Sequence, residues 1–198
     1  MIYLSEKNYE GANEIFKEAL STATRNSELR ALYTYYLVQS RQEKAARDFA
    51  VITLKEPSSR NDVYAMCANG VLLYQSAREI RPSTAEQLRD KMSKNIRSAE
   101  FFDRALQLDP ACAIAAQGIA IILAEGTLLP PGQTGSADTA ARSKNSRDAL
   151  NILAKVRDTS GDGSVYVNLG HVHSARDEWE KAIEHVCPGR LRKETCVF

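Results

Sequence analysis

The sequence predicts an all-α solenoid in which antiparallel helical hairpins stack side by side. The first observation comes from residues 166–182, which read YVNLGHVHSARDEWEKA. Two rings, a leucine and a glycine recur there at the positions i, i+3, i+4 and i+7 that form one helix face: Tyr166, Leu169, Gly170 and His173. Trp179 and Ala182 begin a second helix after a short turn. Such a hairpin cannot bury its apolar face alone, so it needs neighbouring hairpins.

The second observation is that the same pattern recurs along the chain. A small residue opens the second helix of each expected hairpin at Ala12, Ala45, Ser98, Ala149 and Ala182. Larger apolar residues follow four positions later at Phe16, Phe49, Phe102, Leu153 and Val186. The small residues are 33, 53, 51 and 33 positions apart, and tetratricopeptide repeats (TPRs) have a period of about 34 residues. The chain therefore resembles a TPR protein, which implies a right-handed superhelix of antiparallel helix pairs.

These positions divide the chain into five expected repeats within one solenoid over residues 1–185. Their approximate bounds are 1–25, 26–59, 63–110, 111–161 and 162–185. The third repeat exceeds the TPR length because its apolar spacing continues over residues 61–80, so we expect longer helices there. The fourth repeat contains a Pro- and Gly-rich stretch, which predicts a mobile, exposed loop over residues 126–145.

Residues 186–198 do not continue the helical pattern. They read VCPGRLRKETCVF, where the last helix of a repeat should carry an aromatic residue. We expect this irregular tail to be non-native, as translation of an unspliced intron would give. The apolar face of the fifth hairpin, with Tyr166, Leu169 and Val186, would then lack a covering repeat. Solenoid ends without a polar cap associate, so the chain is expected to self-associate through this end.

Composition and charge exclude several classes of function. The 198 residues are 43% hydrophobic, and the formal net charge of +1 gives no electrostatic basis for nucleic-acid binding. No run of about 18 apolar residues is present, so no membrane span is expected. The four cysteines lack a CxxC pair and are expected to be reduced thiols in a nuclear or cytosolic protein: Cys67, Cys112, Cys187 and Cys196.

The sequence gives no basis for an enzyme, a metal site or a cofactor. No nucleophile with a paired base, phosphate-binding loop or pair of carboxylates is recognisable. Four residues match the start of a calcium-binding EF-hand loop: Asp158, Ser160, Asp162 and Gly163. Leu169 stands where that loop requires a bidentate glutamate. His171 and His173 point away from each other on a helix, so they cannot share a metal, and we expect no catalytic residue, metal or cofactor.

Two longer segments, residues 98–124 and 148–185, carry motifs beyond the general TPR pattern. These motifs are LDP at 108–110, AAQGI at 115–119, LA at 123–124, AKVR at 154–157 and VNLGH at 167–171. The segments resemble consecutive repeats of the large TPR subunit of the RNA polymerase II-associated factor complex, the Paf complex. Residues 61–73, NDVYAMCANGVLL, resemble the preceding repeat, whereas residues 1–60 match only as TPR.

The resemblance implies a nuclear scaffold that joins partner subunits, travels with elongating RNA polymerase II and supports histone modification during transcription. It implies no catalytic activity. Members of that family have a long superhelix followed by a charged tail, whereas this chain holds a few repeats. The alternative is a general cytosolic TPR adaptor or co-chaperone.

Stacked TPR hairpins form a concave groove, lined by the second, fifth, ninth and twelfth positions of each first helix. The ninth and twelfth positions give the candidate partner-binding residues Leu37, Val71, Tyr74, Ile119, Ile122 and His171. A mostly apolar groove suits an extended or helical partner segment. A clamp for an acidic C-terminus needs a Lys/Asn or Lys/Arg pair at the fifth and ninth positions. These positions contain Arg30 but no such pair, so no clamp is expected. The competing interpretation is that Val71, Ile119 and Ile122 are internal packing residues.

Overall fold

Helices account for all the regular structure in the computed structural model, which describes residues 9–126, 136–159 and 163–187. These residues form nine α-helices and one short 3-10 helix, and they contain no strand. In chain order the helices are α2 (Tyr9–Thr22), α3 (Ser27–Gln39), α4 (Glu43–Lys55), the 3-10 helix η1 (Pro57–Ser59), α5 (Val63–Glu79), α6 (Ala85–Leu108), α7 (Ala113–Ala124), α8 (Ser136–Thr159), α9 (Ser164–Ser174) and α10 (Trp179–Val186). The all-α prediction is confirmed.

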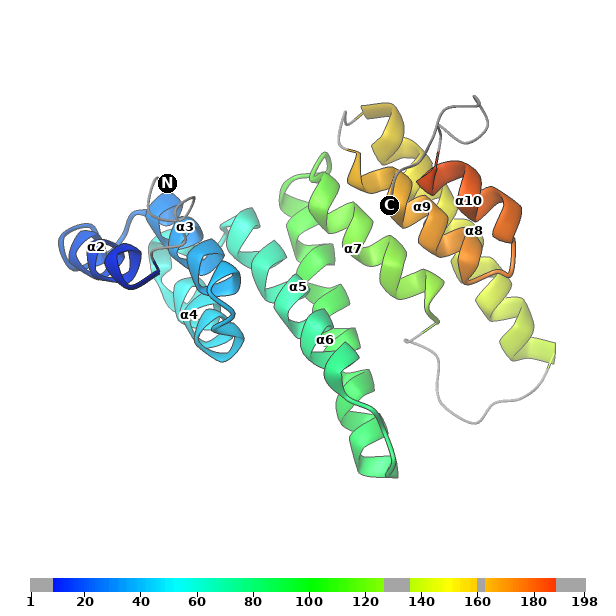
Figure 1. The fold of residues 1–198 in the computed structure, drawn as a ribbon, viewed down its shortest axis with the longest axis horizontal. Coiled ribbons are helices and arrows are strands. Elements are labelled where there is room, and N and C mark those ends of the chain that lie inside the picture. The colour runs from blue at the N-terminus through cyan, green and yellow to red at the C-terminus, as the bar shows by residue number, and fades with distance from the viewer. Residues whose placement is uncertain (1–8, 127–135, 160–162, 188–198) are drawn as a thin grey trace.

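The helices pack as consecutive hairpins, α3 with α4, α5 with α6, α7 with α8 and α9 with α10. The second helix of each hairpin also contacts the first helix of the next, so α4 packs on α5, α6 on α7 and α8 on α9. First helices contact each other between hairpins, as α5 does with α7 and α7 with α9. Figure 1 shows the resulting row of hairpins, from α2 at one end to α9 and α10 at the other. This stacking is the solenoid that the sequence predicts.

Side-chain caps mark where several helices begin. The Asn26 side chain accepts a hydrogen bond from the backbone N–H of Leu29 at 2.9 Å, at the start of α3. Asp62 accepts one from the N–H of Ala65 at 2.8 Å, at the start of α5. Thr84 caps α6 in the same way. Each cap satisfies an amide donor that a helix start leaves unpaired, so these starts are encoded locally in the sequence.

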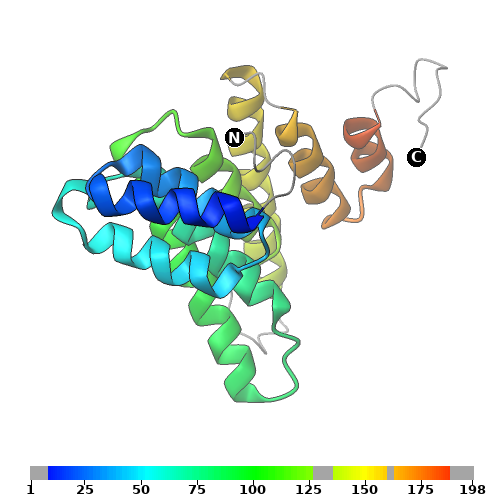
Figure 2. The ribbon, with the colours of Figure 1, turned by 60° about the vertical axis from the view of Figure 1, so that its left-hand side comes forward.

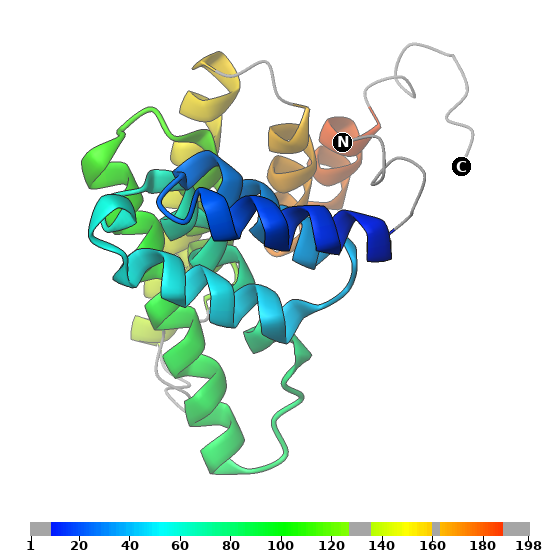
Figure 3. The same ribbon diagram turned by 90° about the vertical axis from the view of Figure 1, so that its left-hand side faces the viewer.

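The third hairpin is extended, as its continued apolar spacing predicts. Helix α5 has 17 residues and α6 has 24. The end where α5 connects to α6 projects away from the rest of the stack (Figures 2 and 3). Ser98 on α6 donates a hydrogen bond to the carbonyl oxygen of Gly70 on α5 at 2.6 Å. The small side chain at position 98 thus allows the two helices to lie close together.

The second part of the expected loop over residues 126–145 is helical, which corrects the sequence prediction. Helix α8 begins at Ser136, and residues 127–135 lie outside the described part of the chain. The first turns of α8, SADTAARSKNS, lack apolar periodicity. Most of the described side chains there are exposed or half-buried, so the helix needs no apolar face at this end. Alanines favour a helix without being buried. The start of α8 is therefore a helix whose sequence pattern does not distinguish it from a polar loop.

The second repeat differs from the predicted register by one position. Ala45, the expected small residue of its second helix, is exposed, whereas Ala46 is fully buried. The buried face of α4 is formed by Ala46, Ala50 and Thr53. The predicted register rests on Phe49, which is only partly buried at the edge of the core. The third and fourth repeats follow the expected register, since the corresponding residues are all buried: Ser98, Phe102, Ala105, Ala149, Leu153 and Val156.

Phe102 joins the third hairpin to the fourth. This side chain belongs to α6 and is 2% exposed. A Cβ atom added to Gly70 of α5 would lie 2.7 Å from its ring, and one added to Gly118 of α7 would lie 2.5 Å from it. These distances are too short for real Cβ atoms, so both glycines are needed for α5 and α7 to close around the ring.

Gly170 lies where α9 crosses α10, as the sequence pattern predicts. A Cβ atom at Gly170 would collide with Cγ2 of Val186 and lie 3.1 Å from the carbonyl oxygen of Ala182. Replacing Gly170 with leucine is expected to lower the free energy of unfolding by about 1–3 kcal/mol, because overpacking forces the helices apart. Urea denaturation followed by circular dichroism measures the change. The control is Gly163→Ala, where an added Cβ atom meets nothing within 4 Å; equal effects at both positions would contradict the crossing.

Candidate partner-binding groove

An apolar groove runs along the first helices of three successive hairpins, α3, α5 and α7, and encloses about 160 Å³. The lining of this apolar groove consists of Thr34, Tyr35, Val38, Tyr64, Cys67, Ala68, Val71, Leu72, Gln75 and Ile114. Three large side chains of the lining remain well exposed, Tyr35 at 42%, Tyr64 at 45% and Ile114 at 51%. The groove therefore presents aromatic and aliphatic surface of the kind that protein partners cover.

One end of the apolar groove is acidic. Tyr64 also lines a neighbouring depression of about 360 Å³ between α3 and the start of α5. Glu28 and Asp62 belong to the lining of that depression, together with Leu32. An apolar segment lying along the groove would thus meet negative charge beside Tyr64.

The structure divides four of the predicted groove residues between surface and core. Val71 lines the apolar groove, and Ile119 is partly buried against the core of the third and fourth hairpins. Leu37 and Ile122 are only 2% and 1% exposed, which differs from their predicted place on the groove surface. Both are packing residues, because each lies within a cluster of buried side chains from more than one helix.

In α3 the groove is formed by the residues one position beyond those predicted. Val38 lines the groove in place of the predicted Leu37, and Tyr35 is the exposed residue one position beyond Thr34, which is only 5% exposed. The shift matches the one-residue shift of α4. The cause of the shift is that α3 carries apolar residues on all its faces, so periodicity alone does not show which face is buried. The burial of Tyr36 among the rings of the N-terminal core sets the rotation of α3 about its axis.

The other two predicted residues, Tyr74 and His171, meet through a glutamate that sequence reasoning missed. The Tyr74 hydroxyl donates to Oε1 of Glu125 at 2.7 Å, and Nε2 of His171 lies 3.3 Å from the same oxygen. Burial opposes ionisation of Glu125, but the hydrogen bonds from His171 and Tyr74 outweigh it and lower the Glu125 pKa. Burial in turn raises the pKa of Tyr74. These residues connect α5, α7 and α9, so they fix the relative positions of three hairpins.

A second polar contact links α7 to α9. Oε1 of Gln117 accepts hydrogen bonds from the Asn168 side-chain amide at 2.7 Å and from the Ser164 hydroxyl at 3.1 Å. Gln117 is only 6% exposed. The signal that could have identified it was present in the sequence: Gln117 is the one polar side chain within the otherwise apolar or glycine sequence of α7, Ala113–Ala124. Buried polar groups need partners.

Arg30 is part of the core and not a surface cation. Its side chain is 6% exposed, and Nε donates to the Thr53 hydroxyl at 3.1 Å while Nη1 donates to the carbonyl oxygen of Thr24 at 3.0 Å. The guanidinium carbon lies 4.9 Å from the centre of the Phe49 ring, a distance typical of a cation–π contact. The arginine that came nearest to a clamp position in the sequence therefore faces inward.

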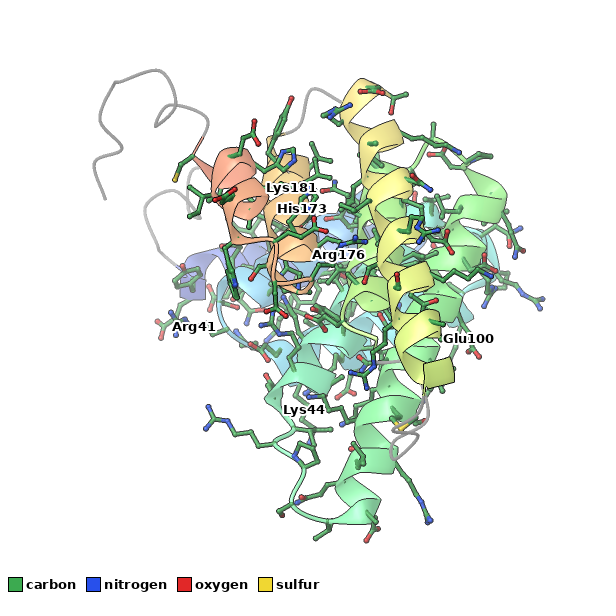
Figure 4. The ribbon with its side chains drawn as sticks, turned by 90° about the vertical axis from the view of Figure 1, so that its right-hand side faces the viewer. Arg41, Lys44, Glu100, His173, Arg176 and Lys181 are labelled. Atoms are coloured by element: carbon green, nitrogen blue, oxygen red, sulfur yellow. The ribbon has the colours of Figure 1, made fainter. Side chains whose placement is uncertain are left out.

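A charged network holds the connection between α9 and α10. Oε2 of Glu178 lies 2.7 Å from Nδ1 of His173 and 3.3 Å from the Lys181 ammonium. The other carboxylate oxygen, Oε1, lies 2.9 Å from the Arg176 guanidinium. Figure 4 shows His173, Arg176 and Lys181 gathered at this connection. The hydrogen bond from His173, with those from Arg176 and Lys181, lowers the pKa of Glu178 to about 2. The His173 ring also stacks on His185 of α10, with 5.2 Å between ring centres.

Lowering the pH is expected to weaken the α9–α10 hairpin in two steps. Burial and the nearby His173 lower the pKa of His185 below 6.5. The unfolded chain then binds a proton before the folded one, and stability falls as the pH drops below about 6.5. Folding lowers the pKa of Glu178 from 4.5 to about 2. The stability that ionised Glu178 contributes is therefore fully present above about pH 4.5 and is lost as the pH falls toward 2. Hydrogen exchange of α9 and α10 amides measures both steps; a His185→Gln variant that keeps the first step would contradict the assignment.

The calcium interpretation gains no support from the described residues. Asp158 is exposed and pairs with Arg157 at 3.0 Å, while Ser160 and Asp162 lie outside the described ranges. Within those ranges no three His, Cys, Asp or Glu side chains gather as metal ligands. None of the described helices is both long and apolar enough to cross a membrane.

The last hairpin leaves apolar side chains uncovered. Tyr166 and Val186 are 44% and 52% exposed, and Trp179 and Ile183 of α10 are 58% and 52% exposed. Leu169, in contrast, is 4% exposed within the core. Self-association through this face stays a prediction, and residues 188–198 of the expected irregular tail lie outside the described residues.

Comparison with known proteins supports the repeat assignment. No protein-family model matches the chain. Over 187 residues, 93% of the chain, it is 27% identical to tetratricopeptide repeat protein 1 of Schizosaccharomyces pombe, and over 162 residues, 80% of the chain, 31% identical to RNA polymerase-associated protein CTR9 of Saccharomyces cerevisiae. The chain spans 16% and 13% of the lengths of these relatives. Together with the stacked hairpins, these similarities show that the chain is an all-helical solenoid of the tetratricopeptide-repeat type.

Proposed function

We propose that the chain is a non-catalytic scaffold of a nuclear transcription-elongation complex of the Paf type. Its TPR relatives support a protein-interaction scaffold, and one of them is named as an RNA polymerase-associated protein. The proposed partners are Paf-complex subunits and the RNA polymerase II machinery. The proposed role is to hold these partners together during elongation and co-transcriptional histone modification.

The observation that carries the proposal is the apolar groove across α3, α5 and α7. Tyr35, Tyr64 and Ile114 expose large apolar surfaces along one line of first helices. Covering such surface contributes about 25 cal/mol per Å² before the cost of ordering the partner. The acidic end beside Tyr64, formed by Glu28 and Asp62, adds a chemical preference. The proposed ligand is a partner segment with spaced apolar side chains followed by a lysine or arginine.

The alternative is a cytosolic TPR adaptor or co-chaperone without a carboxylate clamp. The relative from Schizosaccharomyces pombe is named only for its repeats, and it supports this alternative equally. The two functions differ in their partners. The adaptor would bind cytosolic proteins through the same groove, and Glu28 and Asp62 at the end of the groove would disfavour an acidic C-terminus in either case.

A binding experiment tests the proposal. The purified chain is mixed with Paf-complex subunits prepared without their large TPR subunit, and complex formation is measured by calorimetry. Tyr64→Ser and Ile114→Ser are expected to weaken binding on the order of tenfold or more each, as central interface residues do. Matched controls are Tyr166→Ser and Ile52→Ser, because these side chains are equally exposed, at 44% and 50%, but lie outside the groove lining.

Three results would count against the proposal. The first is no binding to the Paf-complex subunits by a chain with normal helical content. The second is equal weakening by the groove variants and the matched controls. The third is binding to cytosolic chaperones in place of the Paf-complex subunits, which would favour the adaptor.

A further inference from the structure

Two thiols that the sequence places far apart lie in contact beside the apolar groove. Sγ of Cys67 is 3.6 Å from Sγ of Cys112, although the residues are 45 positions apart. Cys67 belongs to the first turns of α5, and Cys112 is the residue that immediately precedes α7. The contact therefore joins the first helices of two successive hairpins. The sequence contains no CxxC pair and predicts reduced thiols, so it gives no sign of this contact.

The two thiols differ in their exposure to solvent. Cys67 is 3% exposed at the base of the apolar groove, and burial, followed by the neighbouring Cys112, raises the pKa of its thiol to about 12. Cys112 is partly exposed and lines a separate depression of about 690 Å³ between the α6–α7 connection and α8. A small oxidant in solution thus reaches Cys112 first, and Cys67 is the nearest thiol to any adduct formed there.

We propose that Cys67 and Cys112 are a redox modification site, at which a low-molecular-weight disulfide such as oxidised glutathione drives formation of an intramolecular disulfide between α5 and α7. A disulfide bond is about 2.05 Å long. The two sulfur atoms are 3.6 Å apart, and we expect side-chain rotation to close the remaining distance without unfolding of a hairpin. The bond would link two walls of the apolar groove covalently.

The reaction balances as two thiol–disulfide exchanges. The Cys112 thiolate attacks one sulfur of oxidised glutathione, the glutathione S–S bond breaks, and one glutathione thiolate leaves. Cys67 then attacks Sγ of Cys112, which releases the second glutathione as a thiolate, and the Cys67 proton passes to that thiolate. The two protein thiols are oxidised to one disulfide, and one glutathione disulfide is reduced to two thiols.

The test uses the full chain with Cys187→Ser and Cys196→Ser, so that only Cys67 and Cys112 react. The protein is equilibrated with mixtures of reduced and oxidised glutathione and analysed by intact mass and non-reducing peptide mapping. We expect loss of two hydrogens and a peptide linked through Cys67 and Cys112. At one glutathione ratio, the yield in the native protein should exceed that in guanidinium by on the order of tenfold, because folding holds the thiols together.

Matched variants separate the pair from other thiol chemistry. Cys112→Ser and Cys67→Ala, each in the same protein, are expected to give at most one glutathione adduct and no linked peptide. The oxidised parent should melt at a higher temperature than the reduced parent, and dithiothreitol should reverse the shift. A native protein that accumulates only glutathione adducts, equal yields of linked peptide in native and denatured protein, or a lower melting temperature on oxidation would each overturn the proposal.

Discussion

Replacing Phe102 with alanine is expected to lower the free energy of unfolding by about 3–5 kcal/mol, the range for deleting a buried aromatic ring. The ring is 2% exposed and lies between Gly70 of α5 and Gly118 of α7. Its loss leaves a cavity where the third and fourth hairpins meet, and the glycines have no side chains with which to fill it. Urea denaturation followed by circular dichroism gives the change.

A double-mutant cycle tests whether Phe102 and Gly118 act as one unit. Gly118→Ala alone should be destabilising by about 1–3 kcal/mol, since its Cβ atom would lie 2.5 Å from the ring. Combined with Phe102→Leu, the same change should cost less, because the shorter side chain leaves room for the methyl group. Additive effects, or a Phe102→Ala variant that loses less than about 1 kcal/mol, would contradict the arrangement.

Replacing Arg30 with alanine is expected to be destabilising by about 2–4 kcal/mol, because two hydrogen bonds from a buried cation and its contact with a ring are lost together. Those contacts are with Thr53, Thr24 and Phe49. Among the described residues, Nη2 of Arg30 has no hydrogen-bond partner. The guanidinium is therefore incompletely satisfied, and part of its burial opposes folding.

The matched control for Arg30 is methionine. Arg30→Met keeps a long apolar side chain and removes the buried charge, so it should be less destabilising than Arg30→Ala. Equilibrium unfolding of both variants measures the difference. If Arg30→Ala left stability unchanged and weakened binding to an acidic C-terminus, Arg30 would be a groove residue after all and the core assignment would be wrong.

The elements that the sequence predicts correctly depend on neighbours along the chain. The pairing of α9 with α10 follows from apolar spacing over residues 166–182, and the crossing at Gly170 follows from a small residue within that spacing. The extended third hairpin follows from continued spacing over residues 61–80. Periodicity and side-chain caps act within a few residues, so a single sequence is enough to recognise them.

The candidate site was predicted less well, because a groove depends on the rotation of each helix about its axis. Of the predicted residues, Val71 lines the apolar groove, whereas Leu37 and Ile122 are buried. Tyr35 takes the groove position in α3, since apolar residues lie all round that helix and its sequence selects no face.

Apolar spacing and small residues at helix crossings are local properties, so they are enough to predict a stack of helical hairpins. Which distant side chains meet is a property of the tertiary packing. It brings Tyr74 and His171 together on Glu125, turns Arg30 into the core and places the Cys67 and Cys112 thiols 3.6 Å apart. The physical reason is that these contacts depend on how one hairpin is rotated and displaced against the next, and that placement is set by the packing of whole helix faces.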